Sequence, residues 1–255
     1  MSNISQLSWK RYVAALRKIS DRMSGEIERW ILTYAVDGNG KILADINSVR
    51  DTNGRSFIDY CYLITREYST YEAALSAQMY DALAALDGAV VPSAEMATLS
   101  TYHDVAKTVN GVLKTSQNVK EMTGAVTRLA KKASCDTMLQ NAYRDRAQFA
   151  WVPSGDTCAF CLALASNGWV NVSARRIKQG YPHAEHIHSN CDCTYAIRFS
   201  RDTTIEGYDP EKYQAVFDAA EERAEEQGYD IGRWNMSKDN LNAVRRMQYA
   251  QSHNG

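Results

Sequence analysis

Four of the six cysteines in this 255-residue chain lie in one stretch between residues 156 and 193. Cys158 and Cys161 form a C-x-x-C pair, and Cys191 and Cys193 form a C-x-C pair about thirty residues later. Two short-spaced pairs of thiolate or imidazole ligands, brought together by the fold, are the usual way in which a protein holds zinc in a tetrahedral site. The stretch therefore predicts a structural zinc site.

Two histidines stand just before the second cysteine pair, so six side chains compete for four ligand positions. In a strand, alternate residues share a face, and both cysteines of the C-x-C pair could therefore reach one metal ion. The preferred set contains the first three cysteines of the stretch, completed by a histidine or by the fourth cysteine. The candidate ligands are Cys158, Cys161, His188, Cys191 and Cys193. The alternative is a group of reduced, buried thiols with hydrogen-bonded histidines.

The same stretch allows an enzyme hypothesis, a small zinc hydrolase acting on nucleic acid or peptidoglycan. His183, Glu185 and His186 would then lie near a metal-bound water, and such a site needs an open coordination position and a base. His183 and Glu185 match the H-x-E half of a zinc deaminase, but there the cysteine pair follows the histidine. Here Cys158 precedes it. A closed, non-catalytic site therefore fits the order of residues better.

Composition sets the class of protein. The formal net charge is -1, which argues against a chain built mainly to neutralise phosphates. The first twelve residues are polar and lack the apolar core of a signal peptide, and no run approaches the ~18 apolar residues that span a bilayer. We therefore expect no membrane contact and synthesis in a reducing cytoplasm. Clustered cysteines in that compartment are metal ligands or thiols rather than disulfides.

Apolar residues recur at steps of three and four through most of the chain, which predicts long amphipathic helices. The expected helices cover residues 8–36 and 57–86, a third begins with Ser93 as N-cap, a fourth follows Val119, and Ser134 caps a fifth. Further on, Asp209 and Pro210 form a helix start, and another helix is expected from Ser237. Residues 191–199 alternate like a strand, and residues 169–172 are expected to pair with them.

These patterns predict a mainly α protein with an elongated helical N-terminal part, a small α+β Cys/His-rich unit and C-terminal helices. The expected units are a helical domain at 1–150, the Cys/His-rich unit at 151–208 and the helices of 209–255. A β-containing unit of roughly fifty residues buries little surface, so a bound metal would stabilise it.

The motifs around the cysteines resemble those of a known family. Cys158–Gly168 reads C-x-x-C-x-x-L-x-S-x-G, His188–Cys193 reads H-x-x-C-x-C, and Ile205–Pro210 follows in order. This arrangement is similar to the minor capsid proteins of tailed bacteriophages, the Mu F-like head-morphogenesis group, in the short form found in phages of Gram-positive bacteria. The resemblance covers residues 140–215. Ser189 departs from it, because the common form has proline there.

The resemblance implies a virion protein without an established catalytic activity. It would be assembled in the bacterial host cytoplasm and lie at the portal vertex or inside the capsid, with the portal protein, the major capsid protein or both as partners. Family members act in head assembly, and some act in DNA packaging or ejection. Contact with packaged DNA is left open by the sequence, as is the identity of the fourth zinc ligand.

Overall fold

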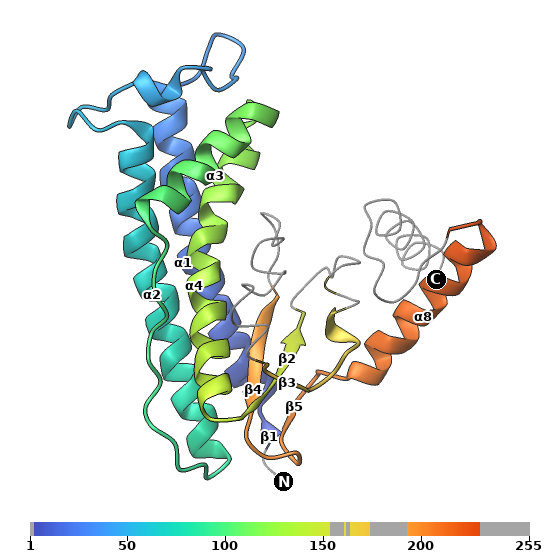
Figure 1. The fold of residues 1–255 in the computed structure, drawn as a ribbon. Coiled ribbons are helices and arrows are strands. Elements are labelled where there is room, and N and C mark those ends of the chain that lie inside the picture. The colour runs from blue at the N-terminus through green and yellow to red at the C-terminus, as the bar shows by residue number, and fades with distance from the viewer. Residues whose placement is uncertain (1–2, 154–160, 162–163, 174–192, 230–255) are drawn as a thin grey trace.

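The computed structural model describes residues 3–153, 161, 164–173 and 193–229. These residues are mainly helical, with a small antiparallel sheet, as the sequence predicts (Figure 1). The helices are α1 (Gln6–Tyr34), α2 (Phe57–Leu86), α3 (Tyr102–Thr115), α4 (Val119–Arg144) and α8 (Pro210–Glu226), with a short 3-10 turn at Ile46–Ser48. No helix in the described ranges is long and apolar enough to cross a membrane.

Helices α1, α2 and α4 lie side by side as a bundle, and α3 packs across α2 and α4 (Figure 1). Their upper part, with the connection after α1, encloses one apolar core that contains no strand residue, which we call the bundle core. It includes Met23, Ile27, Ile46, Phe57, Val105, Met122 and Val126. The amphipathic stripes that the sequence shows on α1 and α2 supply part of this core, and α3, α4 and the connection after α1 supply the rest.

Local capping fixes where two helices begin. The Ser56 hydroxyl accepts from the Asp59 N–H at 3.2 Å, and the Asp59 carboxylate accepts in return from the Ser56 N–H. This reciprocal capping box starts α2 at the residue predicted from the sequence. Thr101 and Asp104 form the same box at α3.

Two predicted helix starts are wrong. Ser93 lies in the irregular segment 89–101, and α3 begins only after Thr101. Ser134 does not cap a helix, because α4 continues through it and its hydroxyl lies 2.7 Å from that of Ser76 on α2. In both cases a contact with another helix decides what the serine does, and local sequence does not contain that contact.

The sheet has the strand order β3-β2-β4, formed by β3 (Val170–Asn171), β2 (Gln148–Val152) and β4 (Thr194–Arg198). Its strands are antiparallel, with Phe149 opposite Val170 on one side and opposite Ile197 on the other. The predicted pairing of 169–172 with 191–199 is therefore wrong, since β2 lies between them. A separate parallel pair joins β1 (Asn3–Ile4) to β5 (Thr204–Ile205).

The sheet packs against the lower ends of α2 and α4, next to the N-terminal end of α1, and forms a second core with them. This shared core includes Trp9, Tyr80, Met138, Phe149, Trp151, Tyr195 and Ile197. It contains residues from both sides of the expected boundary at 150, while the division into three units itself stays a prediction.

One carboxylate ties the end of α2 to the turn after β4. Asp87 accepts hydrogen bonds from the N–H groups of Phe199 and Ser200, at 2.8 and 3.1 Å, and from the hydroxyl of Thr203. The turn of residues 199–203 is thereby held on the bundle by a side chain more than a hundred residues away in sequence.

The chain then enters α8, whose N-cap is Asp209 with Pro210 at the first helical position, as predicted. Figure 1 shows the strands between the bundle and α8, which leads away from them. The helix expected from Ser237 lies outside the described residues.

Candidate functional site

Of the candidate metal ligands, the structure places two. Cys161 is 1% exposed and belongs to the shared core. Cys193 is half-buried, stands directly before β4 and packs against the same core. Both residues therefore contact the shared core, Cys161 within it and Cys193 at its edge.

Cys158, His188 and Cys191 lie outside the described residues, as do His183, Glu185 and His186 of the enzyme hypothesis. Within the described ranges, no group of three or more His, Cys, Asp or Glu side chains is arranged to hold a metal ion. The zinc site therefore stays a prediction, with Cys161 and Cys193 as its two located members. Both are soft thiol ligands in one core, a donor set that suits zinc.

A small cavity of about 30 Å³ connects Cys193 to the bundle. It lies where α1, α2, α4 and the start of β4 meet, at the boundary between the two cores. Val13, Leu16, Cys135 and Cys193 line it together with several polar side chains: Arg17, Ser20, Glu72, Lys131, Ser134 and Thr194. A space of this size holds one or two water molecules.

Glu72 supplies the carboxyl group of this lining, and 1% of the residue is exposed. The Ser20 hydroxyl on α1 donates to its Oε1 at 2.8 Å. Burial raises the pKa of Glu72 to about 7, although the Ser20 hydrogen bond and the nearby Lys131 ammonium both favour the charged form. Glu72 therefore changes charge near neutral pH inside the bundle.

A second hydrogen-bonded chain lies beside Glu72. The Tyr12 hydroxyl is 2.9 Å from the Ser76 hydroxyl, which is 2.7 Å from that of Ser134, so α1, α2 and α4 are joined by three hydroxyls. Burial raises the pKa of Tyr12 above its ordinary value. With hydroxyls satisfied by one another, this cluster links helices and offers no activated nucleophile.

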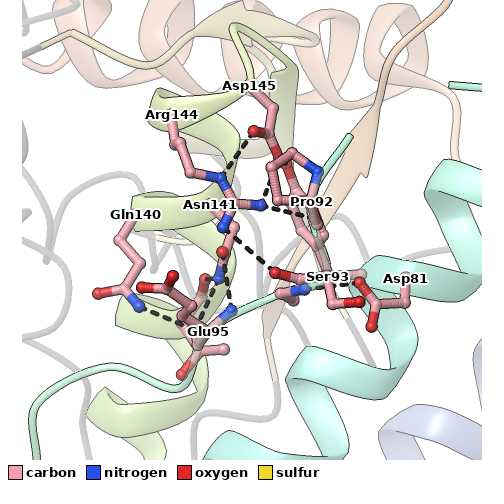
Figure 2. Close-up of polar contacts among 11 residues, drawn as sticks. Asp81, Pro92, Ser93, Glu95, Gln140, Asn141, Arg144 and Asp145 are labelled. Carbon is pink, nitrogen blue, oxygen red and sulfur yellow. Dashed lines mark hydrogen bonds and ion pairs between the residues drawn. The ribbon is translucent and has the colours of Figure 1, made fainter. Parts of the chain in front are cut away.

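The segment of residues 89–101 is held in an extended path across α2 and α4 by side chains that bind its main chain (Figure 2). Asn141 accepts from the Glu95 N–H at 3.0 Å and donates to the Glu95 carbonyl at 2.8 Å. Gln140 also donates to this carbonyl. The Ala94 N–H donates to the Asp81 carboxylate, and the Ala97 N–H donates to the Thr137 hydroxyl. The Arg144 guanidinium donates to the carbonyls of Pro92 and Ser93.

Sequence reasoning found the cysteine motif but missed both of these polar groups. A signal for the buried cluster was present, because Ser20, Glu72 and Ser76 interrupt apolar stripes at core-facing positions of α1 and α2. A polar residue at such a position is either satisfied by a neighbouring helix or costs stability. No comparable signal marks residues 89–101, whose contacts are made by their main chain.

Cys61 lies outside the motif. Cys61 on α2 is fully buried, and burial raises its thiol pKa well above the ordinary value, which makes it an inert core residue. This agrees with its place in an apolar stripe of the sequence.

Comparisons with known proteins place the chain in a family. No curated protein matches this sequence significantly. No solved structure matches it significantly either. The model of the VG15 protein family matches residues 3–220, which include the bundle, the sheet and most of α8. Since the match covers well over half of the 255 residues, the chain belongs to the VG15 protein family.

Proposed function

We propose that this chain is a structural minor head protein of a tailed bacteriophage, bound at the portal vertex and acting in head assembly. The observation that carries the proposal is the ordered set of motifs around the cysteines: Cys158–Gly168, then His188–Cys193, then Ile205–Pro210. Each resembles its counterpart in the Mu F-like minor capsid proteins, and they occur in the same order.

The position of Cys161 supports a structural rather than a catalytic role for this motif. A catalytic zinc site keeps one position open to water or substrate, whereas a structural site is closed by four protein ligands. Cys161 is 1% exposed and packs in the shared core with Phe149 and Tyr195. A metal held there would stabilise the β region against the bundle and need not reach a substrate.

In this proposal the long bundle presents its surface to the portal or the inner capsid, and zinc supports the β region. The chain has no enzymatic activity of its own, and its location is the virion. The same position in the head would also allow the chain to act in DNA packaging or ejection.

The experiment is the double substitution Cys158→Ala with Cys161→Ala in the phage that encodes this chain. We expect purified protein to lose its one equivalent of zinc, and purified heads to contain at least tenfold less of the protein, because the β region no longer folds on the bundle. Metal content is measured by mass spectrometry and incorporation by quantitative immunoblotting of heads.

Cys61→Ala provides the matched control, since Cys61 is a buried cysteine of the bundle core outside the motif. It should keep both zinc and incorporation. Wild-type heads that lack the protein would contradict the head-protein proposal itself. Heads that contain the double variant at the wild-type level would contradict only the zinc-stabilised β region, and metal-dependent hydrolysis by pure protein would support the metalloenzyme instead.

A further inference from the structure

Helix α1 has a stripe of basic side chains on its solvent-facing side. Arg11, Lys18, Arg22 and Arg29 are all exposed. At 3.6 residues per turn, positions i, i+7, i+11 and i+18 fall within about 20° of one line along a helix. Acidic residues of α1 lie to the sides of this line, and one of them, Glu26, approaches Arg22 at 3.8 Å. The stripe is thus basic along its whole length.

The last helix has the opposite stripe with the same spacing. Glu211, Asp218 and Glu222 are exposed on α8, again at i, i+7 and i+11. Each stripe also has alanine at i+4, Ala15 on α1 and Ala215 on α8, so that no bulky side chain stands between the charges. A solvated helix face usually mixes both signs of charge along one line, whereas each of these lines carries one sign. Glu26 of α1 and Glu67 of α2 lie beside the line on α1, next to Lys18 and Arg22.

The two patterns match in spacing. In a parallel arrangement Arg11 meets Glu211, Lys18 meets Asp218 and Arg22 meets Glu222. In an antiparallel arrangement Lys18 meets Glu222, Arg22 meets Asp218 and Arg29 meets Glu211. In either direction, three basic side chains face three acidic ones.

Within one chain, the strands lie between the bundle and α8 (Figure 1). The ion pairs Arg17–Asp21 and Arg22–Glu26 are internal to α1. We propose that the basic stripe of α1 binds the acidic stripe of α8 on a second copy of this chain. This inference does not rest on the head-protein function proposed above.

Such an interface is head-to-tail, because one copy contributes α1 and the next contributes α8. An open assembly then keeps one unused α1 stripe at one end and one unused α8 stripe at the other, until a ring closes or a filament grows. Exposed charge pairs are individually weak and are screened by salt, so the association is reversible and strongest at low ionic strength.

The test uses two charge-reversal variants of the full chain and sedimentation velocity at low ionic strength. The first variant carries Arg11→Glu, Lys18→Glu and Arg22→Glu. The second carries Glu211→Lys, Asp218→Lys and Glu222→Lys. We expect wild type to sediment at twice the mass of one chain or more, and each variant alone to sediment as a single chain. Added salt should dissociate the wild type.

Mixing the two variants is the decisive arm. The acidic α1 of the first variant now faces the basic α8 of the second, and the unchanged stripes also face each other, so the equimolar mixture should recover the wild-type mass. Misfolding of either variant cannot produce this recovery. Circular dichroism checks the helix content of each variant before mixing.

A matched control reverses the same number of charges elsewhere. Lys10→Glu, Lys114→Glu and Lys120→Glu change exposed lysines off the stripe, and this variant should associate like wild type. Wild type that remains a single chain at low salt would overturn the proposal, as would a mixture that fails to recover. If wild type stays single but binds duplex DNA, and only the first variant loses that binding, the stripe contacts nucleic acid instead.

Discussion

The two apolar cores of this molecule are built in different ways. The bundle core takes its side chains from α1–α4 and the connection after α1, each of which already presents an apolar stripe in its own sequence. The shared core combines helix ends with strands whose partners lie far apart, such as Gln148 and Arg198. One core is assembled from local periodicity, and the other requires the bundle as a surface on which three short strands can pair.

This difference indicates an order of dependence. A three-stranded sheet with strands of two to five residues buries little area by itself. Here it gains the ends of α2 and α4 as its second layer. We therefore expect the bundle core to persist without the sheet, but not the sheet without the bundle.

The largest effects should come from matched truncations, one in each core. Ile27 and Ile197 are both fully buried, and replacing either with alanine should cost about 2–5 kcal/mol. Ile27→Ala should speed hydrogen exchange in the helices and in the strands alike. Ile197→Ala should speed it in β2, β4 and the adjacent helix ends while the bundle core stays protected. Equal loss of protection throughout both variants would refute the order of dependence.

Glu72 allows the boundary between the cores to be tested by pH. Because its folded-state pKa is about 7 against an ordinary 4.5, the folded protein binds a proton that the unfolded chain releases between these values. Its contribution is therefore fully present below pH 4.5 and is lost as the pH rises through 7. As the pH rises through this window, the free energy of unfolding of Glu72→Gln should increase by about 3 kcal/mol relative to that of wild type. Urea denaturation of both proteins at several pH values measures this difference.

Glu67→Gln, an exposed position one turn earlier on α2, is the control for that experiment and should leave the pH dependence unchanged. A wild type and Glu72→Gln variant with parallel pH profiles would show that Glu72 stays charged in the folded protein.

The smallest of these effects concerns the segment 89–101. Asn141 is 1% exposed and binds both main-chain groups of Glu95, so Asn141→Ala should cost about 1–3 kcal/mol. Gln140 donates to the same carbonyl from a more exposed position, and Gln140→Ala should cost well under half as much. Thermal unfolding of the two variants compares them, and equal costs would mean that the carbonyl alone matters.

The sequence allowed prediction of those features that local chemistry decides. The stripe and the capping box place α2 at Phe57, and Asp209 with Pro210 places α8. The mainly helical class follows from the same periodicity.

What the sequence could not supply were relations between distant segments. Gln148–Val152 has no alternation because four of its five residues are buried, so β2 and its central place in the sheet were not predicted. Ser93 and Ser134 look like helix caps, yet one lies in a segment fixed by α4 and the other bonds to α2. The cysteine motif was visible from its spacing, whereas the Glu72 cluster depends on three helices meeting.

Asp87 has a mechanical meaning beyond its three hydrogen bonds. The turn at residues 199–203 lies between β4 and β5, so a pull on α8 reaches it after the β1–β5 pair. The carboxylate of Asp87, at the end of the thirty-residue α2, receives that load and passes it along the axis of a long helix. A force applied to α8 would thus be divided between two anchors, the β1–β5 pair at the start of α1 and the Asp87 carboxylate at the end of α2, and carried along both helices.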